Sequence, residues 1–92
     1  MTTRRITVMG KHWRLRFVRR LPENIRGMCD SPELPRKQIR VLQSLRGQEQ
    51  LEVVLHELLH AANWHLDEEW VDQFAKDASH ILAALGPCSE GE

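Results

Sequence analysis

The chain has 92 residues, and its 13 Lys and Arg balance its 13 Asp and Glu, so its formal net charge is zero. This length suits one domain and excludes two independent cores. With 41% hydrophobic and 28% charged residues, the composition is that of a folded domain and not of a disordered chain. No apolar run approaches the roughly 18 residues of a membrane span, and no signal peptide or disulfide framework is evident. We therefore expect a reduced cytoplasmic protein with no membrane partner.

The zero net charge hides an uneven distribution of charge along the chain. Residues 1–46 carry 12 basic and 3 acidic side chains, whereas residues 47–92 carry 1 basic and 10 acidic side chains. A basic half can attract nucleic acid or an acidic substrate. No aromatic residues are interleaved with the arginines as in a binding motif, which favours the simpler interpretation that the two halves attract each other. Nucleic acid stays open as an alternative partner.

The first half of the chain, from about residue 4 to 42, is predicted to form strands. A β-branched run at 6–8 is followed by a turn at Gly10 and by strict alternation over 12–18. The alternation places Trp13 and Leu15 on one face and Arg14 and Arg16 on the other, which predicts a hairpin with one buried and one basic face. Further short strands are expected at 25–29 and 38–42, with a loop between them.

The second half is predicted to form two helices, at about 48–63 and 67–85, because its apolar residues recur at helical spacing. Asn63 is expected to end the first helix in a left-handed conformation, and Asp67 to cap the second. The tail at 87–92 is expected to be loose. Strands followed by two helices, joined by a turn of three or four residues, predict an α+β domain with a small twisted antiparallel or mixed sheet of three or four strands.

One motif in the first predicted helix carries chemistry, the run His56-Glu57-Leu58-Leu59-His60. Two histidines four residues apart project side by side from a helix and can bind one metal ion. Glu57 is then placed to hold a zinc-activated water and to take its proton, as in the zinc hydrolase signature HExxH. A shuffled chain of this composition would contain about 0.025 such matches, so two ordinary surface histidines are the weaker interpretation.

A catalytic zinc site needs a third protein ligand and an open position. Glu68 lies at the edge of the predicted apolar face of the second helix, at its first turn, where a short connection brings it beside His60. Glu69 is a rival ligand, although it is expected to face water. His65 is the other rival, in the turn. A simpler interpretation of Glu68 and Glu69 is that acids in a first turn favour the helix dipole. The predicted apolar face itself comprises Val71, Ala75, Ala78 and Leu82.

The spacing of Glu68 and Asp72 after the HExxH motif resembles that of the gluzincins, the thermolysin-type zincins. The segment 68–75 also resembles the helix that follows HExxH in ImmA/IrrE-type peptidases, and the whole chain is similar to minigluzincins and small phage-type metallopeptidases. The resemblance covers about residues 39–85. It implies a zincin-like fold, one zinc ion on His56, His60 and Glu68, and Asp72 as the acceptor for a histidine ligand. It also implies a cleft along an edge strand, for which we expect Gln38–Leu42.

Three functional hypotheses follow from these residues. The first is a zinc-dependent metallopeptidase that hydrolyses peptide bonds, with Glu57 as general base and then general acid. Because the chain has no tyrosine, His65, His12 or an arginine would stabilise the oxyanion. The second is a non-catalytic domain that zinc stabilises. The third is a nucleic-acid-associated binding or protease module that uses the basic sheet.

The remaining sulfur and aromatic side chains are expected to be structural. Cys29 is expected to be a buried strand cysteine, although a thiolate can also occupy the open position of a zinc site. The three tryptophans are expected in the core or at its edge, with two of them packing across the helix turn: Trp13, Trp64 and Trp70.

Overall fold

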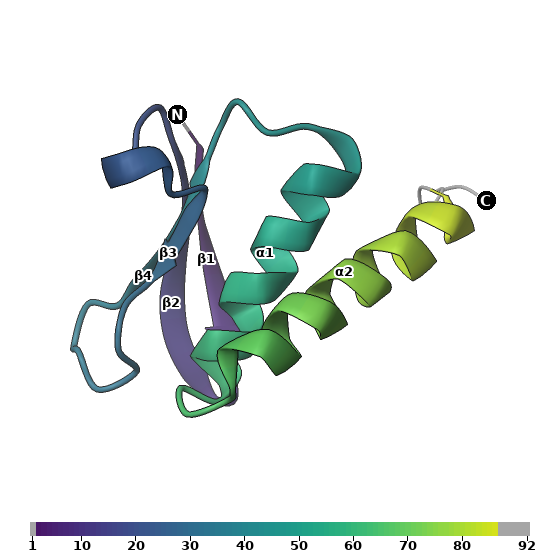
Figure 1. The fold of residues 1–92 in the computed structure, drawn as a ribbon. Coiled ribbons are helices and arrows are strands. Elements are labelled where there is room, and N and C mark those ends of the chain that lie inside the picture. Colours follow the sequence, from purple (N-terminus) through teal and green to yellow (C-terminus); the bar gives the residue numbers. More distant parts are fainter. Residues whose placement is uncertain (1, 87–92) are drawn as a thin grey trace.

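The strands and helices of the chain follow the predicted order, strands first and helices second (Figure 1). The computed structural model describes residues 2–86, so the tail predicted to be loose at 87–92 lies outside the described residues. The α+β class is confirmed. The elements in chain order are β1 (Thr2–Val8), β2 (Lys11–Val18), a 3-10 turn (Pro22–Asn24), β3 (Gly27–Cys29), β4 (Gln38–Leu42), α1 (Gly47–Ala62) and α2 (Glu68–Leu85).

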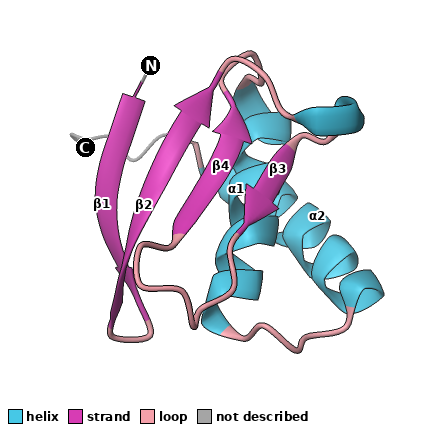
Figure 2. Cartoon of the chain, turned by 90° about the vertical axis from the view of Figure 1, so that its left-hand side faces the viewer, coloured by secondary structure: helices cyan, strands magenta, loops and turns pink. Residues whose placement is uncertain are grey.

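The four strands form one mixed sheet in the order β1-β2-β4-β3 (Figure 2). Strands β1 and β2 are antiparallel, β2 and β4 are parallel, and β4 and β3 are antiparallel. The expectation that Gln38–Leu42 is the edge strand is therefore wrong, since β4 has a partner on both sides. The edge on this side of the sheet is β3, which pairs Gly27 with Val41 and Cys29 with Ile39.

The β1–β2 hairpin has the two faces that its alternation predicts. Its two-residue turn has positive φ at both Met9 (51°) and Gly10 (78°), the conformation that matches the twist of the two strands. Trp13 is 1% exposed and Leu15 is buried, whereas Arg14 on the opposite face is exposed. The buried face is therefore the one that α1 covers, and the basic face is open.

The core lies between the sheet and α1. Helix α1 packs against β3, β4 and β1, whereas α2 packs against α1 alone among the described elements (Figure 1). Full burial of each large apolar side chain contributes about 1.5–3 kcal/mol. The buried cluster comprises Trp13, Leu15, Ile39, Val41, Leu45, Val53 and Ala61.

The connection between the two helices is longer than predicted. Helix α1 ends at Ala62, and Asn63 is extended (φ −148°), so the expected left-handed stop is wrong. The side chain of Asn63 instead accepts a hydrogen bond from the backbone N–H of His65 at 3.2 Å, which turns the chain locally. The predicted cap is confirmed, because Asp67 accepts a hydrogen bond from the N–H of Trp70 at 3.0 Å.

The buried face of α2 is rotated from the predicted one. Val71, Ala75 and Ser79 are buried, whereas Leu82 is 42% exposed. Leu82 is exposed because α2 diverges from α1 toward the C-terminus of α2, so the last turns of α2 do not pack against α1 (Figure 1). The amide of Gln48, in the first turn of α1, donates a hydrogen bond to the hydroxyl of Ser79 at 3.5 Å. No helix in the described part of the chain is long and apolar enough to cross a membrane.

The three tryptophans do not share one environment. Trp13 is in the core as predicted, but Trp64 and Trp70 are 42% and 50% exposed, so they do not belong to the core. Trp70 stacks on Phe74 of the same helix, with ring centroids 5.2 Å apart, and does not pack on Trp64 across the turn. The ring of Trp64 lies edge-on to that of His60, with centroids 6.5 Å apart, beside the candidate site.

Candidate metal centre

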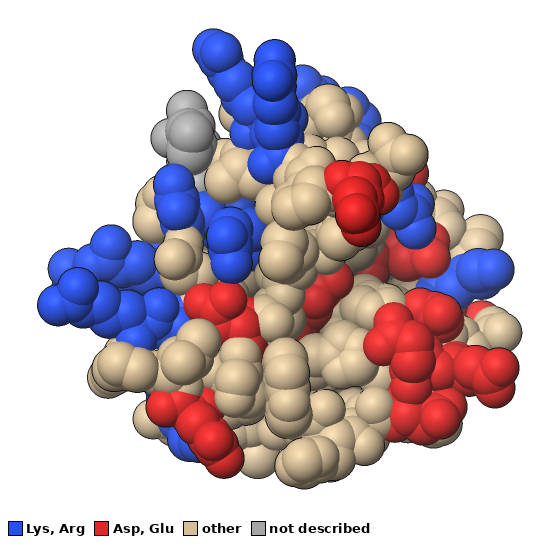
Figure 3. All heavy atoms as spheres, turned by 60° about the vertical axis from the view of Figure 1, so that its left-hand side comes forward, with Lys and Arg blue, Asp and Glu red and all other residues tan. Residues whose placement is uncertain are grey.

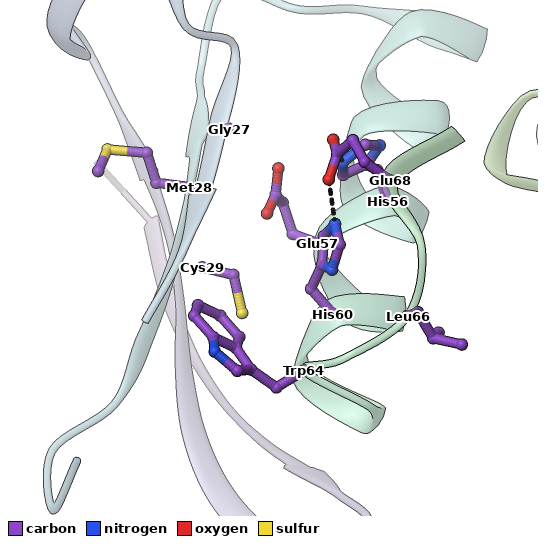
Figure 4. Close-up of a pocket in the computed structure, with 9 residues that line it drawn as sticks. All are labelled: Gly27, Met28, Cys29, His56, Glu57, His60, Trp64, Leu66 and Glu68. Atoms are coloured by element: carbon purple, nitrogen blue, oxygen red, sulfur yellow. Dashed lines mark hydrogen bonds and ion pairs between the residues drawn. The ribbon is translucent and has the colours of Figure 1, made fainter. Parts of the chain in front are cut away.

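Helix α1 supplies three of the side chains of the candidate site. His56 and His60 project from the flank of α1 that faces the first turn of α2, and their ring centroids lie 5.0 Å apart. Glu57 projects instead toward the sheet and is only 8% exposed (Figure 4). The continuous helix fixes this division, because neighbours in sequence point about 100° apart whereas residues four apart lie side by side.

Helix α2 brings the fourth side chain. The two carboxylate oxygens of Glu68 lie 3.0 Å from Nε2 of His56 and 2.9 Å from Nε2 of His60 (Figure 4). One potential ligand atom from each of these three residues lies within 4.8 Å of the others. Within residues 2–86 no other such group of three His, Cys, Asp or Glu occurs. The structure thus brings together the three residues that helical geometry favoured.

This donor set fits zinc. Two imidazole nitrogens and one carboxylate are a common set of protein ligands for catalytic zinc, which leaves the fourth position to water or substrate. The histidine side chains are 19% and 14% exposed and that of Glu68 is 66% exposed, so the group opens to solvent on the side of α2. Here Glu68 bridges the two imidazoles directly, which holds the three ligands close together.

Asp72 contacts the other nitrogen of His56. Its Oδ1 lies 3.1 Å from Nδ1 of His56, one turn beyond Glu68 on α2. A carboxylate in this position accepts a hydrogen bond from Nδ1–H, which leaves Nε2 with a lone pair toward the group of ligands. The structure therefore places Asp72 where the sequence predicted a support for a histidine ligand.

Glu57 is the buried acid of the site. Burial, together with the negative charge of Glu68, raises the pKa of Glu57 from 4.5 to about 7. A carboxyl group with a pKa near neutrality exchanges a proton readily in both directions at neutral pH. The position and the pKa of Glu57 both suit a group that takes a proton and later returns it.

The ligand group lies in a pocket of about 600 Å³ between α1 and β3 (Figure 4). In the space-filling view the surface is hollowed between its basic and acidic sides (Figure 3). Sequence reasoning missed most of the wall, because pocket walls form only when strand and helix meet. The position of Trp64, one helical turn beyond His60 in the sequence, was the one indication that it could line the site. Besides His56, Glu57, His60 and Glu68, the residues that line the pocket are Gly27, Met28, Cys29, Trp64 and Leu66.

Gly27 allows β3 to approach α1 closely. A Cβ atom on Gly27 would lie 2.7 Å from Cγ1 of Val53 and 3.0 Å from Oε2 of Glu57, both closer than ordinary contacts. The absence of a side chain at Gly27 therefore makes room for the carboxylate of Glu57 beneath the edge strand.

The rival ligands lie apart from this group. His65 and Glu69 are exposed and line no part of the pocket. His12 lies at the β1–β2 hairpin, so neither it nor His65 is placed to stabilise an oxyanion in the pocket. Arg26 lines a smaller hollow that also includes His56 and Glu57, and its guanidinium is ion-paired with Glu49 at 2.7 Å.

Cys29 lies on β3 as expected, but it is half-buried at the pocket wall. Burial, with smaller contributions from the charges of Glu57 and Asp30, raises the pKa of its thiol to about 12. Its S–H donates a hydrogen bond to the carbonyl of Asp30 at 3.4 Å. Cys29 is therefore a neutral wall residue at physiological pH.

Comparisons of the chain with family models, curated proteins and solved structures gave no match. The residues of this pocket and their geometry are therefore the basis on which its function is inferred.

Proposed function

We propose that the protein is a zinc-dependent peptidase whose metal is held by His56, His60 and Glu68. The observation that carries this proposal is the convergence of these three ligand groups beside the buried carboxyl of Glu57, in one pocket. Two histidines on one helix would be weaker support, because helical spacing alone places them side by side. The third ligand comes from a different helix, so only the packing of the two helices brings it to the histidines. All three ligands suit zinc, and the site has an open side.

Each residue of the pocket has a separate part in the proposed hydrolysis. Zinc would supply Lewis acidity, which polarises the scissile carbonyl and makes water more acidic at neutral pH. Glu57 would accept a proton from the attacking water and then deliver it to the leaving amine. Asp72 would keep the imidazole of His56 oriented through Nδ1, at 3.1 Å. Arg26, at the adjoining hollow, is the candidate to stabilise negative charge on the oxyanion.

The edge strand β3 is the proposed binding surface for the substrate backbone. It ends the sheet order, so one side of β3 has no strand partner within the described residues, and this side borders the pocket. An extended peptide can add to such an edge through backbone hydrogen bonds. The apolar wall formed by Met28, Trp64 and Leu66 would favour an apolar side chain next to the scissile bond.

A second function of the metal is structural, and the packing of α2 favours it. Helix α2 contacts α1 and no strand of the described sheet, and its last turns diverge from α1. A metal bound by two side chains of α1 and one of α2 would join the helices at their connected end, and the free energy of metal binding would stabilise the folded domain. The structural and catalytic functions are compatible.

The zinc content of protein purified without added metal tests the site. We expect one zinc per chain in the wild type and in the controls Glu69→Ala and His65→Ala, and loss or strong weakening of binding in Glu68→Ala. Zinc retained by Glu68→Ala but lost from either control would move the third ligand to that residue. Absence of zinc from the wild type, even after reconstitution, would refute the metal site.

Turnover by Glu57→Gln tests the catalytic part of the proposal. With a peptide library as substrate, we expect hydrolysis by the wild type to fall by at least about 100-fold in Glu57→Gln, because the proton acceptor is lost. The variant should still bind one zinc per chain. If Glu57→Gln hydrolyses peptides as fast as the wild type, Glu57 is not the base. If zinc binds but no peptide is cut, the structural function alone remains.

A further inference from the structure

The open face of the sheet, opposite α1, carries a group of basic residues. Arg5 on β1 is the cross-strand partner of Arg14 on β2, and Arg16 is paired in register with Arg40 on β4. The loop before β4 adds Arg36 to this face, and Lys37 lines the adjoining hollow at its rim, with Nζ 5.8 Å from the ring centroid of Trp13. We call Arg5, Arg14, Arg16, Arg36 and Lys37 the basic face.

These charges are arranged at a cost to the fold. Like charges directly opposite each other on neighbouring strands are destabilising, and Arg5 and Arg14 are both exposed in this arrangement. Arg40 is compensated by Asp30, at 3.2 Å, whereas Arg5, Arg14 and Arg36 make no ion pair with the residues that the structure describes. The residual repulsion would be relieved by an anion bound across the strands.

The basic face also has a suitable shape. Two adjoining hollows of about 510 and 560 Å³ share Arg14 and Arg36, and neither is lined by an acidic residue. Figure 3 shows the largest groups of Lys and Arg along the left and top of the molecule and the largest group of Asp and Glu on the right, with smaller acidic groups near the centre and at the lower left. The pocket with Glu57 and Glu68 is lined by different residues, so the two sites are separate.

We propose that the basic face binds the phosphate backbone of double-stranded DNA. Four of its five charged residues are arginines, whose planar guanidinium groups bind phosphate oxygens in pairs. Of the two aromatic residues that line these hollows, Trp13 is only 1% exposed and His12 offers a single exposed imidazole, so the hollows lack the row of aromatic side chains on which successive single-stranded bases stack. Recognition is therefore expected to be independent of sequence.

The lining of the two hollows favours a DNA duplex over an RNA duplex. Recognition of RNA duplexes uses contacts to 2′-hydroxyls across the minor groove as well as to phosphates, whereas the charged side chains that line these two hollows are all cationic and suit phosphates.

Salt dependence of binding measures the number of phosphates that the basic face contacts. For a fluorescent 20-base-pair DNA we expect log K to fall with log salt concentration with a slope of about −4.5, from five cationic residues and about −0.9 per phosphate. The double variant Arg14→Gln/Arg36→Gln should bind about tenfold or more weakly in 50 mM salt, with a slope smaller by about 2. The charge-matched control Arg46→Gln/Lys76→Gln, which removes two positive charges away from the basic face, should bind as the wild type does.

A thermal melt of both double variants separates loss of binding from loss of folding. Because Arg14→Gln/Arg36→Gln relieves repulsion, it should melt at the same temperature as the wild type or higher, at low salt and without DNA. A lower melting temperature would give these arginines a structural role and overturn the proposal. DNA should raise the melting temperature of the wild type and of the control, but should raise that of Arg14→Gln/Arg36→Gln much less.

Four other outcomes would overturn the proposal. They are no binding of the duplex at 50 mM salt, equal losses in the two double variants, tighter binding of single-stranded DNA or of an RNA duplex of the same length, and tighter binding of polyglutamate. The proposal does not depend on the metal centre: Glu57→Gln and addition of a chelator that leaves the protein folded should not change DNA affinity. Its failure can thus be distinguished from failure of the proposed peptidase.

Discussion

Glu57 illustrates how one residue couples stability to chemistry. Its carboxyl group is buried under the edge strand, and its pKa of about 7 lies well above the 4.5 of an exposed glutamate. Between these two pH values the folded protein binds more protons than the unfolded chain. The contribution of Glu57 to stability therefore rises as pH falls from about 7 to about 4.5, and is constant outside this range.

The first prediction at this scale concerns the pH dependence of unfolding without metal. Urea unfolding in the presence of a chelator should show that the wild type gains stability relative to Glu57→Gln as the pH is lowered from 8 to 5. The full gain is at most about 3 kcal/mol, from about 1.36 kcal/mol per unit of pKa. The exposed control Glu69→Gln should follow the wild type. Parallel profiles of the wild type and Glu57→Gln would contradict the raised pKa.

A second residue-scale prediction concerns Gly27. The change Gly27→Ala should destabilise the protein by about 1–3 kcal/mol, because the new Cβ would lie 2.7 Å from Val53 and 3.0 Å from Glu57. Adding Val53→Ala removes the closest contact, so the double variant should lose less than the sum of the two single changes. A double-mutant cycle of chemical unfolding checks this. Additive losses in the free energy of unfolding would mean that the new Cβ at Gly27 does not clash with Val53.

At the scale of elements, α2 has two functions in the site. Its first turn carries Glu68, and its second carries Asp72, on the flank that faces the histidines of α1. This works because the cap at Asp67 starts the helix at a defined residue, so that the two acids, one turn apart, meet two different nitrogens of His56. The geometry of the site therefore depends on how α2 begins more than on how it ends.

The prediction at this scale is that Asp72→Asn weakens zinc binding by about 10–100-fold, because the support of His56 is lost. The control Asp77→Asn, five residues farther along α2, changes an acid that accepts a hydrogen bond from the side chain of Gln73 and should leave zinc affinity unchanged. Competition with a chromogenic zinc chelator measures both affinities. Equal affinities of the wild type and Asp72→Asn would show that the contact at 3.1 Å does not support the ligand.

At the scale of the whole molecule, a chain of 92 residues has little surface to bury, so metal binding is expected to matter for stability. A ligand at 100 times its Kd stabilises the folded state by about 2.7 kcal/mol. Since 1 kcal/mol shifts the melting temperature of a domain this small by about 4–8 °C, zinc should raise it by about 10–20 °C.

Calorimetry with zinc and with a chelator measures this shift. Glu57→Gln should keep the full shift, because Glu57 is not a ligand, and Glu68→Ala should lose most of it. A melting temperature that zinc does not change would contradict tight binding to the folded state. A shift retained in Glu68→Ala would mean that the stabilising metal is bound elsewhere.

The sequence by itself determined the features that depend on neighbours along the chain. The spacing of His56 and His60 places them side by side on any α-helix, and the alternation of Trp13, Arg14 and Leu15 separates the buried and basic faces on any strand. Asp67 as helix cap is local in the same way. Helical geometry also favoured Glu68 over Glu69, because only one of two adjacent residues can face a packed neighbour.

Only the tertiary structure decided the order of the strands and the shape of the pocket. Strand β3 is short, and its pairing outside β4 depends on contacts between residues distant in sequence, so the edge strand was predicted wrongly. The end of α2, the exposure of Trp64 and the contact between Gly27 and Glu57 depend in the same way on where α1 lies against the sheet. Periodicity describes the faces of an element, but packing selects the partner that each face meets.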